Sequence, residues 1–289
     1  MTASFGRVWR VAVLELGIAV RSRRALVITL LFVAVAAFVM YGTVSAFAAM
    51  EREVLSALGL PASDAPGSVT TVLWRSKPFL HIVGRMVGDD LVFADICGRH
   101  PVVLAYALFI FQIVPLLTLL VSAPRVAEDL HNGTARYWLV RVTRTEWSLG
   151  TCAGEAMMLA CAMLVGALSA WAVAIFRLPG LSGAGLLPGL LDWTLRAWAY
   201  AFGWLGLFLG ISHIARSGGK ATALSILALM GTFVWARFCP PLDILVPSSA
   251  QSALWRRDVA PVVSGLVQLA ALSFLYLSVG AAVFRRRDA

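Results

Sequence analysis

The residues with the clearest chemistry form one charged segment, Ser122 to Thr151, between two long apolar runs. Its principal charged side chains are Arg125, Glu128, Arg136, Arg141, Arg144 and Glu146. Guanidinium and carboxylate groups form directed, charge-assisted hydrogen bonds, so they are suited to recognising a charged surface on another protein. Solvated charge at a membrane interface is the alternative interpretation of the same pattern.

Few groups in the chain are suited to catalysis. It has four histidines and contains neither a Gly-x-Ser-x-Gly nor a His-Glu-x-x-His motif. An enzyme acting inside a membrane needs polar pairs within its spans, and the spans offer mainly Gln112 and Gln268. We therefore predict a non-catalytic chain. The two amides are candidates for lining a translocation path, unless each simply bonds to a neighbouring helix.

A nucleotide site is also not expected in this chain. The segment Arg216–Lys220 (RSGGK) resembles a phosphate-binding loop only superficially, because Ile214 occupies the position of the first glycine and Ala221 follows the lysine. We therefore predict that the chain carries no cofactor of its own. If ATP and Mg²⁺ are used, they would be bound by a separate ATPase subunit.

Metal-capable side chains gather in the polar stretch 51–100: His81, Asp89, Asp90, Asp95, Cys97 and His100. Their spacing matches no known ligand pair, so we predict an ordinary polar loop and no metal site, with a metal or substrate receptor as the alternative. Cys97 and Cys239 are both predicted to lie outside the cytoplasm, where an oxidising compartment would permit a disulfide between them.

Composition places the chain in a membrane. Hydrophobic residues make up 60% of it, charged residues only 13%, and the mean hydropathy is +0.84, which together indicate several spans. The formal net charge of +9 is explained by membrane topology and by attraction to anionic lipid. Binding to nucleic acid would instead need a basic soluble surface with stacking aromatic residues, so it is not expected.

Apolar runs predict an all-α membrane protein with six transmembrane helices, forming a single transmembrane domain over residues 1–289. The predicted spans are Ala25–Met50, Pro101–Pro124, Ala156–Phe176, Ala197–Ala215, Ala221–Ala236 and Val259–Phe284. Basic residues near span ends place both termini and the loop 122–155 in the cytoplasm. Residues 51–100 would then be an extracytoplasmic loop, and Arg177–Arg196 a short external turn rich in Gly and Pro.

The leader, residues 1–24, is predicted to be an interfacial helix on the membrane surface. On a helical wheel one arc carries Arg7, Arg10, Glu15 and Arg21. The opposite arc carries Trp9, Val13, Leu16 and Val20. A positively charged cytoplasmic tail without helical structure is the alternative.

One stretch of the charged segment resembles a known family. The run Gly133-Thr134-Ala135-Arg136-Tyr137-Trp138-Leu139, followed by Arg144-Thr145-Glu146-Trp147 and Gly150, is similar to the type-2 ABC transporter (ABC-2) permeases. The positions that fall on that family's pattern are Glu128, Gly133, Thr134, Leu139, Arg144 and Gly150. Two positions depart from it. One residue is missing where the family's proline usually lies, and Thr151 replaces the usual lysine.

The resemblance implies a permease subunit in the inner membrane of a bacterial cell, moving an unidentified substrate, with export expected. It implies a cytoplasmic ABC ATPase and a second permease subunit, identical or different, as partners. The residues that would couple this chain to the ATPase are Glu128, Gly133, Thr134, Arg136, Arg141, Arg144 and Glu146.

An ATP-independent secondary transporter or membrane scaffold is the alternative function. Secondary transporters often carry internal repeats and charges near the membrane midplane, and neither is evident in this sequence. A subunit that transmits force to a periplasmic partner, and exports nothing, is a variant of the permease interpretation.

Overall fold

The structure is a computed structural model, and it describes residues 4–57, 100–178, 183–238 and 240–286. Nearly all of these residues are helical, and none lies in a strand. The predicted all-α fold is therefore confirmed for the described chain. The predicted metal-capable residues before His100, and both cysteines of the predicted disulfide, lie outside the described residues.

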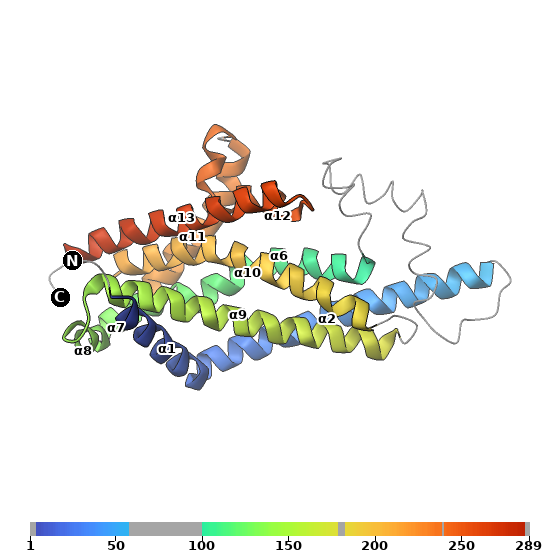
Figure 1. The fold of residues 1–289 in the computed structure, drawn as a ribbon, viewed down its shortest axis with the longest axis horizontal. Helices are drawn as coiled ribbons and strands as arrows, with labels where there is room; N and C mark the ends of the chain where they lie inside the picture. Colours follow the sequence, from blue (N-terminus) through green and yellow to red (C-terminus); the bar gives the residue numbers. More distant parts are fainter. Residues whose placement is uncertain (1–3, 58–99, 179–182, 239, 287–289) are drawn as a thin grey trace.

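Long helices and a few short helical segments make up the structure (Figure 1). In chain order the α-helices are α1 (Phe5–Arg21), α2 (Arg23–Ala57), α6 (Pro101–Ser122), α7 (Arg125–His131), α8 (Thr134–Leu139), α9 (Arg144–Arg177), α10 (Gly183–Ile214), α11 (Gly218–Phe238), α12 (Gln251–Trp255) and α13 (Val259–Arg285). Two 3₁₀ helices, η1 (Pro240–Leu245) and η2 (Pro247–Ala250), connect α11 to α12.

Five stretches of the described chain are long and apolar enough to cross a membrane. They are Arg23–Ala57, Pro101–His131, Arg144–Arg177, Gly185–Ile214 and Val259–Arg285. Four of the six predicted spans lie within these stretches, and a fifth, Ala197–Ala215, does so up to Ile214. The stretches support a multi-pass membrane protein. The remaining predicted span, Ala221–Ala236, is helical within α11 but is not among the five, so a sixth span stays a prediction.

The predicted external turn at Arg177–Arg196 is wrong over most of its length. Helix α10 begins at Gly183 and continues through Pro188, so the helix starts well before Ala197. Pro188 lies one turn inside the helix, so it removes the hydrogen bond that its N–H would have donated to the carbonyl of Ala184, and the helix continues past it. The Gly and Pro residues from Gly183 to Gly189, which predicted a turn, therefore lie in the first turns of α10.

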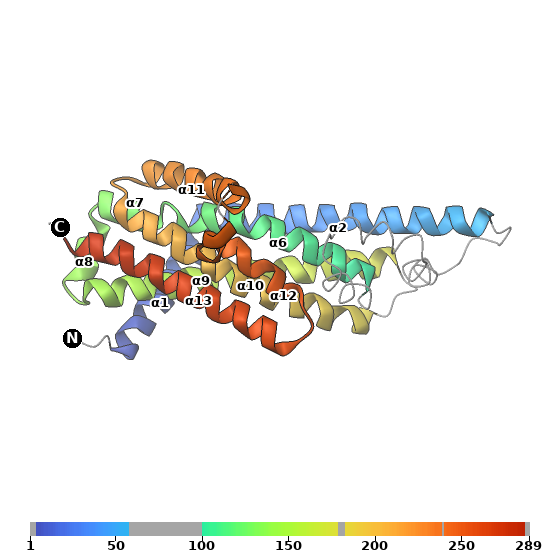
Figure 2. The ribbon, with the colours of Figure 1, turned by 90° about the horizontal axis from the view of Figure 1, so that it is seen from above.

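The long helices run side by side, with α9 and α10 at the centre of the packing. Helix α10 contacts α6, α9 and α13, and α9 also contacts α1 and α2. The described ends of the chain, at α1 and α13, lie at the same end of the bundle as α7 and α8 (Figures 1 and 2). This end therefore gathers segments that are far apart in the sequence.

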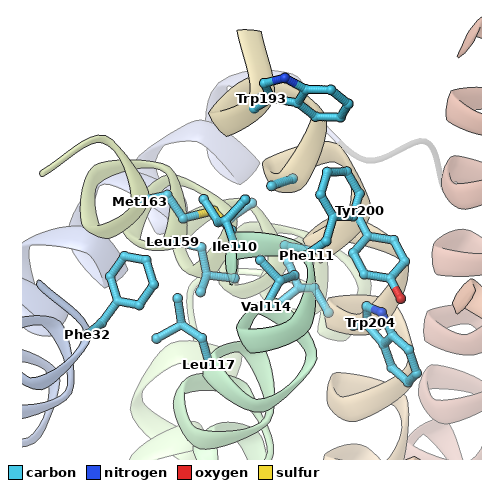
Figure 3. Close-up of a cluster of buried hydrophobic side chains, with 14 of the residues drawn as sticks. Phe32, Ile110, Phe111, Val114, Leu117, Leu159, Met163, Trp193, Tyr200 and Trp204 are labelled. Carbon is cyan, nitrogen blue, oxygen red and sulfur yellow. The ribbon is translucent and has the colours of Figure 1, made fainter. Parts of the chain in front are cut away.

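Aromatic side chains fill the core between these helices. Phe111 on α6 packs against Tyr200 on α10, with ring centroids 5.3 Å apart, and against Trp255 on α12 at 5.4 Å. Phe32 on α2 and Met163 on α9 extend the same cluster across the bundle (Figure 3). The core thus joins α2, α6, α9, α10 and α12 into one packed unit.

Glycines bring α10 and α13 into backbone contact. A Cβ atom added at Gly206 would lie 2.3 Å from the Cα of Ser273, and one added at Gly210 would lie 2.6 Å from the carbonyl oxygen of Tyr276. On the facing helix, Gly280 makes the same close approach to Gly210. These small residues pack helices within the subunit, as they commonly do in membranes.

We expect Gly206→Ala to destabilise the protein by about 1–3 kcal/mol, because the backbone of α13 has no room to move away from the new methyl group. Thermal unfolding in detergent would measure the change. Gly42→Ala on α2 is the matched control, since a Cβ there would meet nothing within 4 Å. If both variants unfolded at the same temperature, the close contact between α10 and α13 would not matter for stability.

Candidate functional site

The charged segment between α6 and α9 folds as two short helices, α7 and α8, separated by a turn at Gly133. This glycine has φ +75°, the one positive φ among the described residues, and it precedes the first residue of α8. A side chain at this position would be strained. Helix α7 is held against α10 because the backbone N–H of Ala127 donates to the hydroxyl of Ser212, 3.0 Å away. The turn at Gly133 therefore separates α8 from α7, which is bonded to α10.

Arg125 forms a buried ion network with carboxylates from three helices. Its guanidinium donates to Glu15 on α1, and lies 3.5 Å from Asp129 on α7 and 3.6 Å from Glu155 on α9. Glu15 and Glu155 are only 2% and 4% exposed. Removing one member of such a network would leave buried charge without its partner. Arg125 thus fixes α1, α7 and α9 relative to one another.

Two glycines of α9 allow α1 to lie directly on it. A Cβ atom at Gly150 would be 2.5 Å from the Cβ of Val11, and one at Gly154 would be 2.7 Å from the Cβ of Glu15. The leader forms a helix, as predicted. Its Glu15, which was predicted on the polar arc, is buried against α9 and does not contact water. Phe5 and Trp9 on the outer side of α1 are 84% and 52% exposed, so an apolar surface remains available to lipid.

Glu128, a predicted coupling residue, pairs with Arg24 at the start of α2. Their charged atoms are 3.1 Å apart, and Arg24 also donates to the carbonyl oxygen of Leu120 at 2.9 Å. Both side chains are about half exposed, so the pair itself adds little stability. Gly218 of α11 packs against the Glu128 side chain, since a Cβ there would lie 2.5 Å from its Cγ. Glu128 therefore sits where α2, α7 and α11 meet.

Glu146, another predicted coupling residue, is buried at the start of α9. Its carboxylate accepts hydrogen bonds from the backbone N–H of Thr143 at 2.9 Å and of Ser4 at 3.1 Å, and it lies 3.8 Å from Arg7. The Thr143 hydroxyl accepts in turn from the Glu146 N–H, completing a capping box. Glu146 thus begins α9 and ties the start of α1 to it.

Arg144 caps the last helix of the bundle. Its guanidinium donates to the carbonyl oxygens of Phe284 at 2.9 Å and Arg285 at 3.1 Å, and lies over the Phe284 ring, 5.0 Å from its centroid. A cation is favourable there because the last carbonyls of a helix lack intrahelical donors. This contact joins the start of α9 to the end of α13.

The remaining predicted coupling residues, Thr134, Arg136 and Arg141, are exposed on or beside α8. Two apolar neighbours that the sequence had not singled out as functional are even more accessible, since Tyr137 is 81% and Val140 is 87% exposed. A surface depression of about 410 Å³ lies beside them. It is lined by Arg136, Leu139, Val140, Val142, Thr143 and Arg144.

The two candidate path-lining amides lie in different surroundings. Gln112 is exposed on the surface of α6. Gln268 on α13 donates to the carbonyl oxygen of Ile244 at 3.0 Å and to the hydroxyl of Ser249 at 2.7 Å, and so holds η1 and η2 against α13. A role for either amide in a translocation path stays a prediction.

Sequence reasoning did not foresee the network around Arg125. The i,i+4 spacing of Arg125 and Asp129 on one short helix was the available signal. Glu155 gave a second signal, because it is an acid within an otherwise apolar helical run. Nothing in the sequence showed that Glu15, more than a hundred positions away, would meet them.

Comparison with protein families matches residues 9–243 to the family described as "ABC-2 family transporter protein". The matched range begins within α1 and ends within η1, so it includes the whole charged segment. No curated protein matches the chain.

We expect Arg125→Gln to cost about 3–5 kcal/mol of stability, because three carboxylates would lose their shared cation. Tryptophan fluorescence during heating in detergent would follow unfolding. Arg136→Gln makes the same chemical change at an exposed position and should leave the transition unchanged. Equal unfolding temperatures for the two variants would contradict a stabilising role for the network.

We expect Arg144→Ala to loosen the last turn of α13, because Phe284 and Arg285 would lose the donor that caps their carbonyl groups. Amide hydrogen exchange of residues 280–286 should become faster, with the rest of α13 unchanged. Arg141→Ala, which removes an exposed guanidinium of the same segment, serves as the control. Unchanged exchange at the end of α13 in Arg144→Ala would show that this cap is dispensable.

Proposed function

Since this chain belongs to the ABC-2 family of transporter proteins, we propose that it is the permease subunit of an ABC exporter whose ATP is hydrolysed by a separate cytoplasmic subunit. Five apolar spans and the family membership support a membrane transport subunit. The exposed apolar surface of α8 is the observation that supports an ATPase as the partner of this chain.

Helix α8 has the composition of a protein-binding surface. Tyr137 and Val140 expose most of their side chains although they lie in the charged segment. Arg136 borders the same depression and offers a cation for directed bonds. Tyrosine and arginine are enriched where proteins bind one another, and an apolar centre with a charged rim is typical of such contacts.

Contacts behind α8 would carry a force from a partner into the bundle. Arg144 links the segment to α13, Glu146 links it to α1, and Glu128 links α7 to α2. Arg125 adds a buried connection between α1, α7 and α9. A partner that contacts α8 differently in its two nucleotide states would therefore shift several spans together.

The proposal includes a second permease subunit, identical or different, and a bacterial inner membrane with α7, α8 and both termini in the cytoplasm. Location of the described ends of α1 and α13 beside α8 supports one common side for them (Figure 2). The basic residues Arg136, Arg141 and Arg144 near a span favour the cytoplasm for that side. ATP and Mg²⁺ would be bound by the partner ATPase.

We expect Val140→Glu combined with Tyr137→Glu to abolish copurification of an ATPase with the tagged chain. The substituted side chains contact solvent in the free subunit, so the fold should be preserved while the apolar centre of the surface is lost. Mass spectrometry of proteins retained in mild detergent would identify the ATPase and its amount relative to the chain.

Thr145→Glu adds one carboxylate at an exposed position of the same segment, outside α8, and should retain the ATPase. Retention by the doubly substituted chain would show that α8 is not the binding surface. Absence of any ATPase from the unsubstituted chain, in several detergents, would contradict the proposed ATP-driven function.

A further inference from the structure

A second cleft lies between α1, α2, the end of α6, α7 and α9. It has a volume of about 210 Å³. Its charged lining consists of Arg24, Arg125, Glu128 and Glu155. Its apolar lining includes Ile18, Ile28, Val121 and Met158. The cleft is therefore amphipathic, with charges on one part of its wall and hydrocarbon on the other.

Charges around this cleft do not balance. Counting those that line it or contact its lining, the carboxylates are Glu15, Glu128, Asp129 and Glu155, and the guanidinium groups are Arg24 and Arg125. If every group is ionised, four acids against two cations leave a formal excess of two negative charges. A cationic group is the ligand that such an excess favours. Donor geometry for a metal is lacking, because no group of three or more His, Cys, Asp or Glu side chains among the described residues is placed to hold one.

Glu155 supplies a free acceptor. The residue lines the cleft and is 4% exposed, and its Oε1 lies 3.6 Å from the Arg125 Nε. Its Oε2 is buried and has no hydrogen-bond partner in the described part of the chain. A buried carboxylate oxygen without a donor is costly. A primary ammonium group, with three N–H donors, would satisfy this oxygen and reduce the charge excess at the same time.

Position and shape favour a lipid as the source of this ammonium. The cleft lies beside the first residues of α2, a helix long and apolar enough to cross a membrane, and phospholipid headgroups would contact the end of such a span. At its mouth, Arg24 is about half exposed and uses two of its five N–H donors on Glu128 and Leu120. The remaining donors suit a phosphodiester. The apolar lining would contact the first part of an acyl chain.

We propose that this cleft binds the headgroup of a phospholipid with a primary amine, phosphatidylethanolamine, with its ammonium at Glu155 and its phosphate at Arg24. The bound lipid would be a resident component that fixes α1 against α2 and α9. This inference goes beyond the transport function, since the resident lipid is not the exported substrate and the site does not depend on an ATPase.

Native mass spectrometry of the full chain in detergent would count bound lipids. Dioleoyl-phosphatidylethanolamine, -phosphatidylcholine and -phosphatidylglycerol would be added separately at equal concentration. We expect one ethanolamine lipid per chain, bound about tenfold more tightly than the choline lipid, whose trimethylammonium keeps the charge but cannot donate. The glycerol lipid, which lacks the amine, should bind no better than the choline lipid.

Glu155→Gln should abolish this preference, whereas Glu53→Gln, an exposed acid near the other end of α2, should retain it. Ala19→Trp fills the cleft without changing any charge, and it should exclude the lipid even if Glu155→Gln folds poorly. Equal binding of the three lipids by the unsubstituted chain, or an unchanged preference in Ala19→Trp, would overturn the proposal. If an equal concentration of soluble phosphoethanolamine displaced the lipid, the cleft would bind the free headgroup, and a lipid would not be the specific ligand.

Discussion

The ion network of Arg125 is the interaction on which the end of the bundle near α7 and α8 depends. One guanidinium contacts carboxylates from α1, α7 and α9, and those carboxylates are almost entirely buried. A network of this kind contributes less through net stabilisation than through geometry, because moving any one helix away would leave charge buried without its partner. The leader helix and the charged segment are therefore parts of one structure, although α2 and α6 lie between them in the sequence.

Fold class and the course of most spans could be predicted from the sequence, because the length of an apolar run is a local property. Local signals also predicted α1 as a helix. The same signals gave a wrong environment for Glu15. The helical wheel grouped it with the arginines of the polar arc, but it is buried against Arg125. A helical wheel shows which residues share a face, but it cannot show which helix covers that face. Gly150 and Gly154, which let α1 approach, reveal that partner only in three dimensions.

The candidate site was also predicted only in part from the sequence. Sequence patterns singled out Glu146 and Arg144 as charges for an outside partner, and both make their closest contacts within the chain, at the ends of α1 and α13. Adjacency of those two ends to the start of α9 could not be inferred from spacing along the sequence. Arg136 and Arg141 remain exposed, and they share their surface with Tyr137 and Val140, whose apolar character in a polar segment was visible but not used. Contacts within the chain therefore account for Glu146 and Arg144, and the proposed partner surface consists of the exposed side chains.

Helix α9 runs without interruption from its capping box at Thr143 to Arg177, a length of about 50 Å for its 34 residues. Contacts with α1 lie near its first turns, while Gly166 receives the Phe32 ring of α2 farther along. Both sets of contacts depend on one helical phase. Inserting a single residue between Glu155 and Gly166 would rotate the two parts by about 100° relative to each other and separate them by 1.5 Å, roughly one residue's share of the helix. An insertion in this part of α9 would therefore disrupt one of the two sets of contacts, even if it left every side chain that makes them unchanged.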